Sequence, residues 1–476
     1  MSEARNVSSF SALGLSSSLV RALKALYITV PTAIQAATIP AILEGRDVIG
    51  GAETGSGKTL AFALPILHKL QSDMMGGYGL ILTPTRELAV QLHEQFLAVG
   101  QGSRMGLKCA LVLGGMDMMK QAIELAGERP HLIVATPGRL ADLLQSGGRQ
   151  EWGLERCKFV VLDEADRLLS PTFAKDLGYI FSILPPARMR QTLLFTATLT
   201  PEIERLTQKE PEPGKLPPLL RKIQTSTTMP ASLTQQYVFV PSHVREPYLY
   251  YLLYHAPCGN PAPLPIDSTT NHNRDKHPKR RTIDSDLPGI PLTIIFVARC
   301  ETAELLSRML SELGVDNVSL HSLLTQTKRM ENLQAFRSQS VPILISTDVG
   351  SRGLDIPDVK MVVNWDLPVA WEDYVHRVGR TARKKQKGWA VSFVTERDIQ
   401  LVQNIEQKIE QKLIELELPE ARVLEHLNEV GSAKRAASIA LHDEHFGERR
   451  ERNKKKARIA NQETSSRKRS KTKVEE

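Results

Sequence analysis

A glycine-rich segment near residue 50 has the residue types and spacing of a phosphate-binding loop. An apolar run at 48–51 precedes Ala52-Glu53-Thr54-Gly55-Ser56-Gly57-Lys58-Thr59, and a helical pattern begins at Leu60. The glycines let backbone amides point at phosphate oxygens, Lys58 can reach the β and γ phosphates, and the Thr59 hydroxyl can ligate Mg²⁺. Glycine-rich turns also occur without a nucleotide, but Gly-Lys-Thr between strand and helix favours nucleotide binding, although Ala52 stands where Gly is usual.

Two adjacent acids end another apolar run and supply the second half of a nucleotide-hydrolysing site. Asp163 follows 159–162 and is suited to hold Mg²⁺, while Glu164 is suited to orient and deprotonate the attacking water. The same pair of acids could also simply stabilise the N-terminus of the helix that it begins, without any catalytic role. Because about 100 residues of alternating strand and helix pattern connect this pair to the phosphate-binding loop, we favour the catalytic interpretation.

These side chains need a scaffold, and the apolar pattern predicts one. Runs of strand length alternate with amphipathic helical patterns, which is typical of a parallel sheet with helices on both faces. We expect strands at 78–83, 107–113, 132–135, 159–163, 192–196, 293–297, 318–321, 343–347, 361–364 and 390–394. We expect helices at 86–98, 116–126, 301–313, 327–338 and 398–413. The repeat of the pattern predicts an α/β protein with two domains of similar size.

Shifts in composition predict the domain boundaries. Four prolines between 210 and 218 favour a linker, and 257–291 is a Pro-, Asn-, Asp- and Lys-rich segment without apolar periodicity, which we interpret as a disordered surface insertion. The predicted organisation is an N-terminal extension at 1–36, a first domain at 37–209, a linker at 210–221, a second domain at 222–415 containing the insertion, and a C-terminal extension with a disordered basic tail at 416–476.

The charge of the chain lies mainly in that tail. The net charge is +8, and residues 447–476 contain 12 Lys and Arg and 5 Glu, so that 12 − 5 = +7 of it lies there. Such a tail favours a polyanionic partner or a nuclear address, although a solvated terminus without a specific role is as plausible. The 4 cysteines are far apart, which argues against a disulfide framework and a thiolate zinc site and favours a reducing compartment. No apolar run reaches the roughly 20 residues of a membrane span, and the N-terminus lacks the apolar core of a secretory signal.

The motifs, taken in order, resemble those of the DEAD-box ATP-dependent RNA helicases of superfamily 2, and the resemblance covers residues 10–412. Asp163-Glu164-Ala165-Asp166 is the motif that names the family, and Phe10 with Pro31-Thr32-Ala33-Ile34-Gln35 resembles the adenine-sensing Q motif. The resemblance implies two tandem RecA-like domains, each a parallel sheet covered by helices. It also implies ATP and Mg²⁺ as cofactors and RNA bound across a cleft between the domains.

Residue roles follow from the resemblance, position by position. It implies ATP contacts at Phe10, Gln35, Thr54, Gly55, Ser56, Gly57, Lys58, Thr59, Gly353 and Asp355, with Thr59 and Asp163 at the metal. It implies catalytic roles for Lys58, Glu164, Arg380 and Arg383, the two arginines neutralising charge on the γ-phosphoryl group when the domains close. It implies RNA contacts at Arg86, Gly115, Thr136, Arg139, Arg329 and Thr347, and relays between the two ligands at Asp166, Thr196, Thr198 and His376.

Three positions depart from the family pattern, and three of the predicted RNA-binding arginines have an alternative interpretation. Tyr27-Ile28 replaces a usual Gly-aromatic pair, Thr196 a usual Ser, and Ala382 a usual Gly. Arg86, Arg139 and Arg329 taken singly could be solvated helix-face arginines, but their places within motifs favour RNA contact.

The expected function is ATP-dependent local unwinding of RNA duplexes or remodelling of RNA–protein particles. An ATP-dependent RNA clamp and a DNA helicase on the same core are the alternatives. The lysine-rich tail, with clusters at 454–456 and 467–471, and the Gly379-Arg380-Thr381-Ala382-Arg383 ending most resemble the nucleolar helicases of small ribosomal subunit assembly. We therefore expect a monomer that is located in the nucleus, specifically in the nucleolus. We expect it to act on pre-ribosomal RNA with a protein cofactor of pre-ribosomal particles, and splicing is the alternative pathway.

Overall fold

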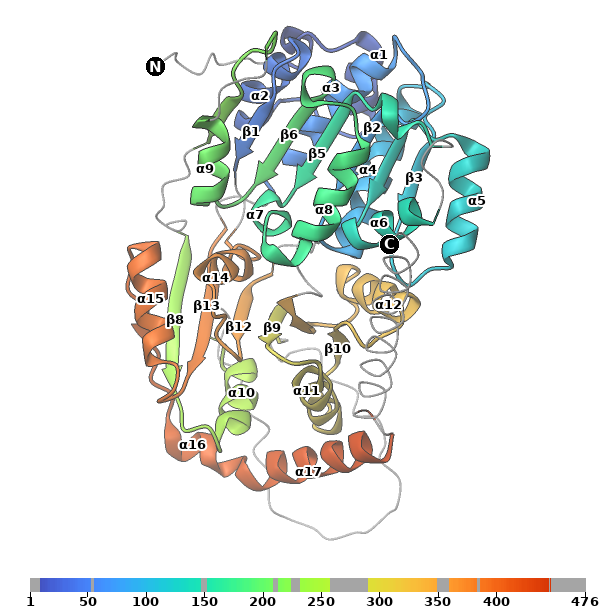
Figure 1. The fold of residues 1–476 in the computed structure, drawn as a ribbon. Coiled ribbons are helices and arrows are strands. Elements are labelled where there is room, and N and C mark those ends of the chain that lie inside the picture. The colour runs from blue at the N-terminus through green and yellow to red at the C-terminus, as the bar shows by residue number, and fades with distance from the viewer. Residues whose placement is uncertain are drawn as a thin grey trace, which may run out of the picture. The chain divides into compact units, whose positions relative to one another are not determined.

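The chain divides into two compact units, each built on one parallel sheet (Figure 1). The computed structural model describes residues 9–52, 55–146, 152–208, 213–223, 232–256, 290–348, 359–382, 386–444 and 446. The first unit spans Met1–Pro230 with Arg352–Ile356, and the second spans Ala231–Ser351 with Pro357–Glu476. The expectation of two helix-covered parallel sheets is confirmed. Within the described residues, no helix is long and apolar enough to cross a membrane.

The first unit has a seven-stranded sheet in the order β3-β4-β2-β5-β6-β1-β7. Its strands are β1 (Val48–Gly51), β2 (Gly79–Leu82), β3 (Cys109–Val112), β4 (Leu132–Ala135), β5 (Phe159–Asp163), β6 (Gln191–Thr196) and β7 (Leu219–Lys222). Its helices are η1 (Ser11–Leu13), α1 (Ser17–Ala25), α2 (Ala33–Leu43), α3 (Lys58–Leu70), α4 (Arg86–Gly102), α5 (Met118–Glu128), α6 (Pro137–Gln145), η2 (Leu154–Arg156), α7 (Ala165–Leu168), α8 (Pro171–Ile183), η3 (Ala187–Met189) and α9 (Pro201–Gln208). One apolar core lies between the sheet and α1 to α4, and a second lies on the opposite face beneath α5 to α9. Burial on both faces explains the continuous apolar runs of β2, β4 and β5.

The N-terminal segment is part of the first core. Leu19, Ala22 and Leu23 form a buried stripe on α1 at the spacing of one helix face, and α1 packs on α4. The sequence-based division into an extension at 1–36 and a domain from 37 therefore separates residues that share one core.

The predicted linker at 210–221 also differs from the structure. Its residues 219–221 belong to β7, which pairs in parallel with β1 at the edge of the first sheet. The Lys215 ammonium lies 2.6 and 2.7 Å from the two carboxylate oxygens of Asp47, and Arg46 donates to the Pro217 carbonyl at 3.0 Å. Prolines exclude a helix here but not an edge strand, because an edge strand leaves one row of backbone groups without a ladder partner.

The second unit has a seven-stranded sheet in the order β10-β11-β9-β12-β13-β8-β14. Its strands are β8 (Leu233–Phe239), β9 (Thr293–Val297), β10 (Asn317–Leu320), β11 (Ile343–Thr347), β12 (Met361–Asn364), β13 (Gly388–Val394) and β14 (Ile414–Glu415). Its helices are α10 (Arg245–Tyr254), α11 (Cys300–Glu312), α12 (Gln326–Arg337), α14 (Trp371–Val378), α15 (Ile399–Ile409), α16 (Glu420–Glu425) and α17 (Leu427–Asp443).

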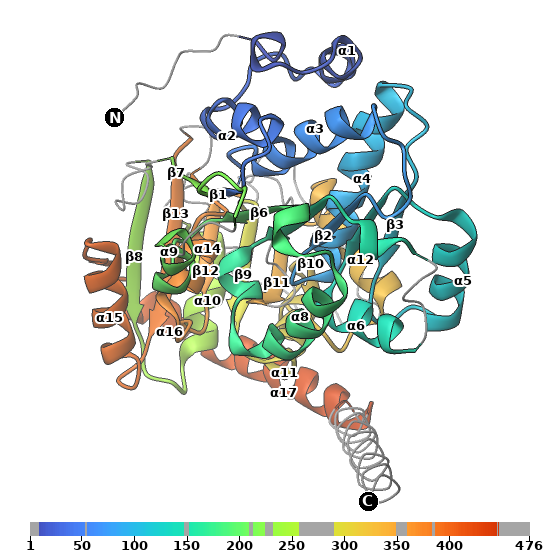
Figure 2. The same ribbon diagram turned by 45° about the horizontal axis from the view of Figure 1, so that its top comes forward.

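The first part of the predicted C-terminal extension completes the core of the second unit. Figures 1 and 2 both show α17 next to α11, and Val423, Val430, Ala433 and Ala437 join the buried cluster. The boundary predicted at 416 thus falls inside a folded unit. Most of the predicted insertion, 257–289, and the basic tail from 447 lie outside the described residues.

Candidate nucleotide and nucleic-acid site

The predicted site residues of the first unit gather at one edge of its sheet. All strand pairs of this sheet are parallel, so their carboxyl ends meet at the same edge, where ligands of open α/β sheets bind. The phosphate-binding loop follows β1, the acidic pair ends β5, and Thr196 ends β6. The loops after β2, β4 and β3 carry the predicted RNA contacts.

The phosphate-binding loop leads directly into α3. Gly55 and Gly57 have positive φ angles of 81° and 92°, which favour glycine, and Gly57 caps the helix that begins at Lys58. The Lys58 ammonium donates to the Ala52 carbonyl at 2.6 Å, so it curls back over the loop. Ser56 and Thr59 lie in the loop and the first turn, where the N-terminal end of α3 favours an anion; Thr54 lies outside the described residues.

Gln35 ties the Q motif to this loop. Its Oε1 accepts from the Thr32 amide at 2.9 Å, and its Nε2 donates to the Gly57 carbonyl at 3.0 Å. A Cβ at Gly57 would lie 2.5 Å from this Nε2, so the contact requires glycine. The resemblance implies that Gln35 contacts ATP. In the structure its amide oxygen and its amide nitrogen both have partners within the protein, and the contact with ATP stays a prediction.

The aromatic residues near the Q motif take different positions. Phe10 is 2% exposed and packs in the core of the first unit, which gives it a packing role, and its contact with ATP stays a prediction. Tyr27 is 94% exposed and has a φ of 59°. This backbone conformation explains why Gly is usual at that position in the family.

The acidic pair combines burial with backbone strain. Asp163 is buried, which raises the pKa of its carboxyl to about 7 although the charge of Lys58 acts in the opposite direction. Glu164 has a φ of 54°, outside the regions that residues with a Cβ prefer. Its buried Oε2 has no hydrogen-bond partner among the described residues. A strained backbone that presents an unpartnered carboxylate oxygen is typical of a functional position.

Three of the predicted relay residues contact one another. The Thr198 hydroxyl donates to Asp166 Oδ2 at 2.5 Å, and the Thr196 hydroxyl donates to the Thr198 carbonyl at 2.7 Å. Thr196 also pairs with Gly51 of β1, and its carbonyl accepts from the Ala52 amide at 3.0 Å. The acidic motif is thus connected through β6 to the start of the phosphate-binding loop. His376, the fourth predicted relay, is buried on α14 of the second unit.

The predicted RNA contacts of the first unit form one group. Arg86 begins α4 and lies against the glycine pair after β3: a Cβ at Gly115 would be 2.4 Å from its guanidinium, and Gly115 has a φ of 85°. Thr136 caps α6, and Arg139 on that helix donates to the Met116 carbonyl at 3.0 Å. Backbone amides, hydroxyls and guanidinium groups at one sheet edge suit phosphate and sugar recognition.

In the second unit, predicted residues lie at the carboxyl ends of the strands and on the helices that follow. Thr347 ends β11, Arg329 lies on α12, and Arg380 follows α14; all three are buried. Gly353, Asp355 and Arg383 lie outside the described residues.

Arg377 is a positioning residue to which the sequence analysis assigned no role. Its guanidinium makes two bonds to the Asp348 carboxylate, at 2.6 and 2.7 Å, and donates to the Asp366 carbonyl at 2.5 Å. It therefore joins the end of β11 to α14, next to Thr347 and His376. The signal in the sequence was Arg377 directly after the predicted relay residue His376, together with Asp348 directly after the predicted strand at 343–347.

The donor set fits a divalent cation that is held together with a nucleotide. Asp163 is a buried carboxylate whose ionised form needs a nearby cation, and Thr59 offers a hydroxyl in the first turn of α3. Within the described ranges, no group of three or more His, Cys, Asp or Glu side chains could hold a metal ion without such help.

Comparisons with known proteins agree with this geometry. Residues 32–206 match the DEAD/DEAH box helicase model, and residues 289–385 match the helicase conserved C-terminal domain. An ATP-dependent RNA helicase DBP8 of Mycosarcoma maydis is 59% identical over 485 residues, covering 97% of this chain and 91% of that protein. The helicase dbp8 of Schizosaccharomyces pombe is 49% identical over 457 residues, covering 95% and 93%.

Solved structures show the same architecture. S. cerevisiae Dbp5 bound to RNA and ADP BeF3 superposes with a TM-score of 0.69 at 26% identity, covering 90% of this chain and all (100%) of that chain. Mss116p bound to ssRNA and AMP-PNP gives 0.71 at 24% identity, covering 88% and 81%, which supports the fold. From these matches and the motifs at the sheet edge, the chain belongs to the DEAD-box family of ATP-dependent RNA helicases, with two tandem RecA-like domains.

Proposed function

We propose that this helicase hydrolyses ATP with Lys58 and Glu164 of the first unit and with Arg380 and Arg383 of the second. The observation that supports it is the carboxyl edge of the first sheet, where the loop of Lys58 follows β1 and the acidic pair of Asp163 and Glu164 ends β5, with only β6 between the two strands. Lys58 neutralises phosphate charge, and Glu164 orients the attacking water and accepts its proton.

Asp163 and Thr59 would hold Mg²⁺ together with the nucleotide. The cation, when bound, neutralises charge on the β and γ phosphates. The cation would stabilise the ionised form of Asp163, because burial alone favours the protonated carboxyl.

The same proposal places ATP and RNA at both units. Gly353 and Asp355 would contact the nucleotide from the second unit, and Arg380 and Arg383 would neutralise the γ-phosphoryl group. RNA would contact Arg86, Gly115, Thr136 and Arg139 of the first unit and Arg329 and Thr347 of the second. The pairing of Thr198 with Asp166 would connect the two ligand sites through β6. Contacts to phosphate and sugar make recognition largely independent of base sequence.

We further propose that the chain acts as a monomer in the nucleolus, on pre-ribosomal RNA during rRNA processing and assembly of the 40S subunit. The support is the resemblance to the nucleolar subgroup together with the basic tail, which favours a polyanionic partner. A protein cofactor of pre-ribosomal particles would select the RNA, since the core contacts do not read bases.

Replacing Glu164 tests the catalytic assignment. Glu164→Gln keeps the size of the side chain but removes the base, so RNA-stimulated turnover should fall at least about 100-fold while ATP-dependent RNA binding persists. The matched control is Glu155→Gln, because Glu155 is an exposed glutamate of the same unit and should retain activity. Wild-type turnover in the Glu164 variant would remove that residue from its role.

The pathway and the output need separate measurements. Cross-linking bound RNA in cells and sequencing it should recover pre-ribosomal RNA; messenger or spliceosomal RNA would refute the assignment. Strand separation of a short duplex, measured next to RNA dwell time, distinguishes an unwinding enzyme from an ATP-dependent clamp. Equal stimulation of ATPase activity by RNA and DNA would favour a DNA helicase.

A further inference from the structure

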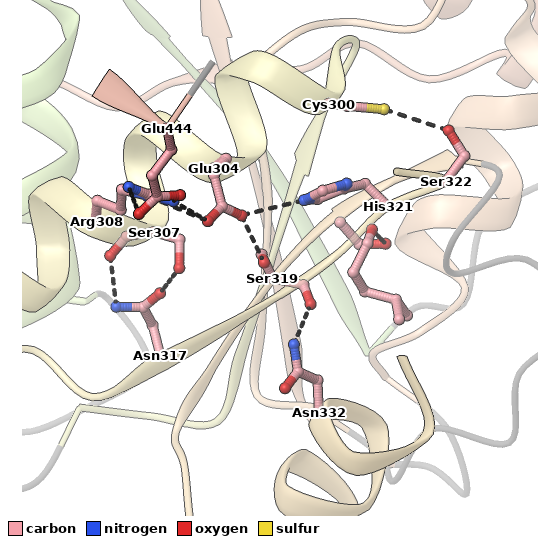
Figure 3. Close-up of polar contacts among 12 residues, drawn as sticks. Cys300, Glu304, Ser307, Arg308, Asn317, Ser319, His321, Ser322, Asn332 and Glu444 are labelled. Atoms are coloured by element: carbon pink, nitrogen blue, oxygen red, sulfur yellow. Dashed lines mark hydrogen bonds and ion pairs between the residues drawn. The ribbon is translucent and has the colours of Figure 1, made fainter. Parts of the chain in front are cut away.

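A cysteine, a histidine and a glutamate lie side by side in the second unit, and none of them is among the predicted ATP contacts. Cys300 begins α11, Glu304 lies one turn further on that helix, and His321 follows β10. In the view of Figure 3, His321 lies between Glu304 on one side and Cys300 and Ser322 on the other. The catalytic proposal above uses none of these side chains.

A hydrogen bond holds the His321 ring from the side of Glu304. Its side chain is 0% exposed, and Nε2 lies 3.1 Å from Glu304 Oε2. Glu304 is itself held by Ser319 at 3.1 Å and by Arg308 at 3.1 Å, and Arg308 also pairs with Glu444 at 2.6 Å. The other ring nitrogen, Nδ1, has no hydrogen-bond partner among the described residues and lies on the side of Cys300.

This arrangement favours charge separation between the thiol and the ring. Burial raises the pKa of the Cys300 thiol, but interactions with His321 and Ser322 outweigh it and lower the pKa to about 7. Burial lowers the pKa of His321, but Cys300 and Glu304 outweigh it and raise the pKa. A carboxylate behind an imidazole stabilises the imidazolium, and an imidazolium stabilises a thiolate.

We propose that Cys300 is a reactive thiolate that is modified by small disulfides of the glutathione type, with His321 and Glu304 as positioning residues. Cys300 is partly exposed, so a small disulfide can reach its sulfur. Its Sγ lies 3.4 Å from the Ser322 hydroxyl, which can donate to the thiolate.

The reaction is a thiol–disulfide exchange. The Cys300 thiolate attacks one sulfur of the disulfide, a new S–S bond to Cys300 forms, and the S–S bond of the reagent breaks. The departing sulfur leaves as a thiolate with the bonding electron pair and takes a proton from solvent. Cys300 is oxidised to a mixed disulfide, and one half of the reagent is reduced to its thiol, so no further oxidant is needed.

The other described cysteines are internal controls. Burial raises the pKa of the Cys109 and Cys157 thiols to about 12, and no histidine lowers either value. Cys258 lies outside the described residues and is replaced by serine in every protein of the experiment. A purely structural role of His321 and Glu304, joining β10 to α11, would give Cys300 the reactivity of an ordinary thiol.

The test is the pH dependence of modification in the native full-length chain. The protein is treated with glutathione disulfide between pH 5.5 and 9.5, quenched in acid and digested with trypsin. The adduct on peptide 300–308, released by cleavage after Arg299 and Arg308, is then quantified by mass spectrometry. The rate at Cys300 should rise with a midpoint near pH 7 and level off above pH 8, whereas Cys109 and Cys157 should remain unmodified.

Two variants test the positioning residues. In His321→Gln the midpoint should move to about 8.5, the value of an ordinary thiol, and the rate at pH 6 should fall about sixfold, since a higher intrinsic nucleophilicity offsets part of the lost thiolate fraction. Glu304→Gln should move the midpoint in the same direction. It remains informative if the buried His321 cannot be replaced without unfolding, which circular dichroism reveals. A wild-type midpoint at or above 8.5, equal modification of Cys109, or unchanged midpoints in the folded variants would overturn the proposal.

Discussion

At the residue scale, the acidic pair of the first unit lowers the stability of the fold in ways that a purely structural site would avoid. Glu164 combines a left-handed backbone with an unpartnered buried oxygen, and Asp163 is a carboxyl removed from water. Each feature costs on the order of 1–3 kcal/mol. Both features occur at neighbouring positions close to the charge of Lys58, which is consistent with a ligand whose binding offsets the free-energy cost.

Replacing Asp163 by Asn should change the pH dependence of stability in the absence of nucleotide. Folding raises the Asp163 pKa from 3.8 to about 7, so the native state holds a proton that the unfolded chain releases, and stability is lost as pH rises from about 4 to 7. The difference in unfolding free energy, Asp163→Asn minus wild type, should grow over this range to at most about 4 kcal/mol. Urea unfolding at pH 5 and 8 measures it.

The control for that measurement is Asp316→Asn, since Asp316 is exposed and its replacement should change stability by less than about 0.5 kcal/mol. A difference that does not vary with pH would show that Asp163 is ionised in the free protein, and the burial argument would be wrong.

At the element scale, the sequence predicted the strands buried on both faces well and missed the partly exposed strand β8. The predicted bounds 132–135, 159–163, 293–297, 343–347 and 361–364 coincide with β4, β5, β9, β11 and β12, because strands buried on both faces are continuous apolar runs. The partly exposed β8 has four polar residues among seven, Thr234, Gln235, Gln236 and Tyr237. Its Gln235 is stabilised by Tyr374 and Gln411, contacts that only the folded chain creates.

The candidate site also contains features that the sequence predicts and features that it does not. Spacing alone placed Lys58, Asp163 and Glu164, since a strand-to-helix loop and a strand end position them locally. It could not show that Gln35 contacts the phosphate-binding loop or that Phe10 is buried, because both depend on how distant segments pack.

Docking of α17 should be needed for the stability of the second unit. Ala437 is 1% exposed on the face of α17 that lies in the core, whereas the adjacent Ala436 is exposed. Ala437→Asp places an unpaired charge in that core and should cost about 3 kcal/mol or more, and Ala436→Asp, the matched control, less than about 1. Tryptophan fluorescence during urea unfolding reports mainly this unit, which contains Trp365, Trp371 and Trp389. Equal effects of the two variants would mean that α17 is not docked in solution.

At the scale of the whole molecule, the predicted activity is a property of both units together. The first holds the phosphate-binding loop and the acidic pair, and the second holds Arg380 and the buried Arg329 and Thr347. Neither unit carries all the proposed contacts to either ligand. ATP and RNA should therefore each favour the arrangement of the units that the other needs, and this coupling is a measurable free energy.

Coupling between ATP and RNA can be measured as a change in the affinity for RNA. A nonhydrolysable ATP analogue should tighten RNA binding of the wild-type chain by about 5- to 150-fold, and RNA should tighten binding of the analogue by the same factor. Arg380→Ala combined with Arg383→Ala should bring the factor toward one and lower RNA-stimulated turnover by about a thousandfold, because the second unit then loses its contact to the γ-phosphoryl group. Fluorescence anisotropy of labelled RNA, with and without the analogue, measures the factor. Arg397→Ala, at an exposed arginine of the same unit, is the matched control. Coupling and turnover that survive the double replacement would mean that hydrolysis does not require these arginines.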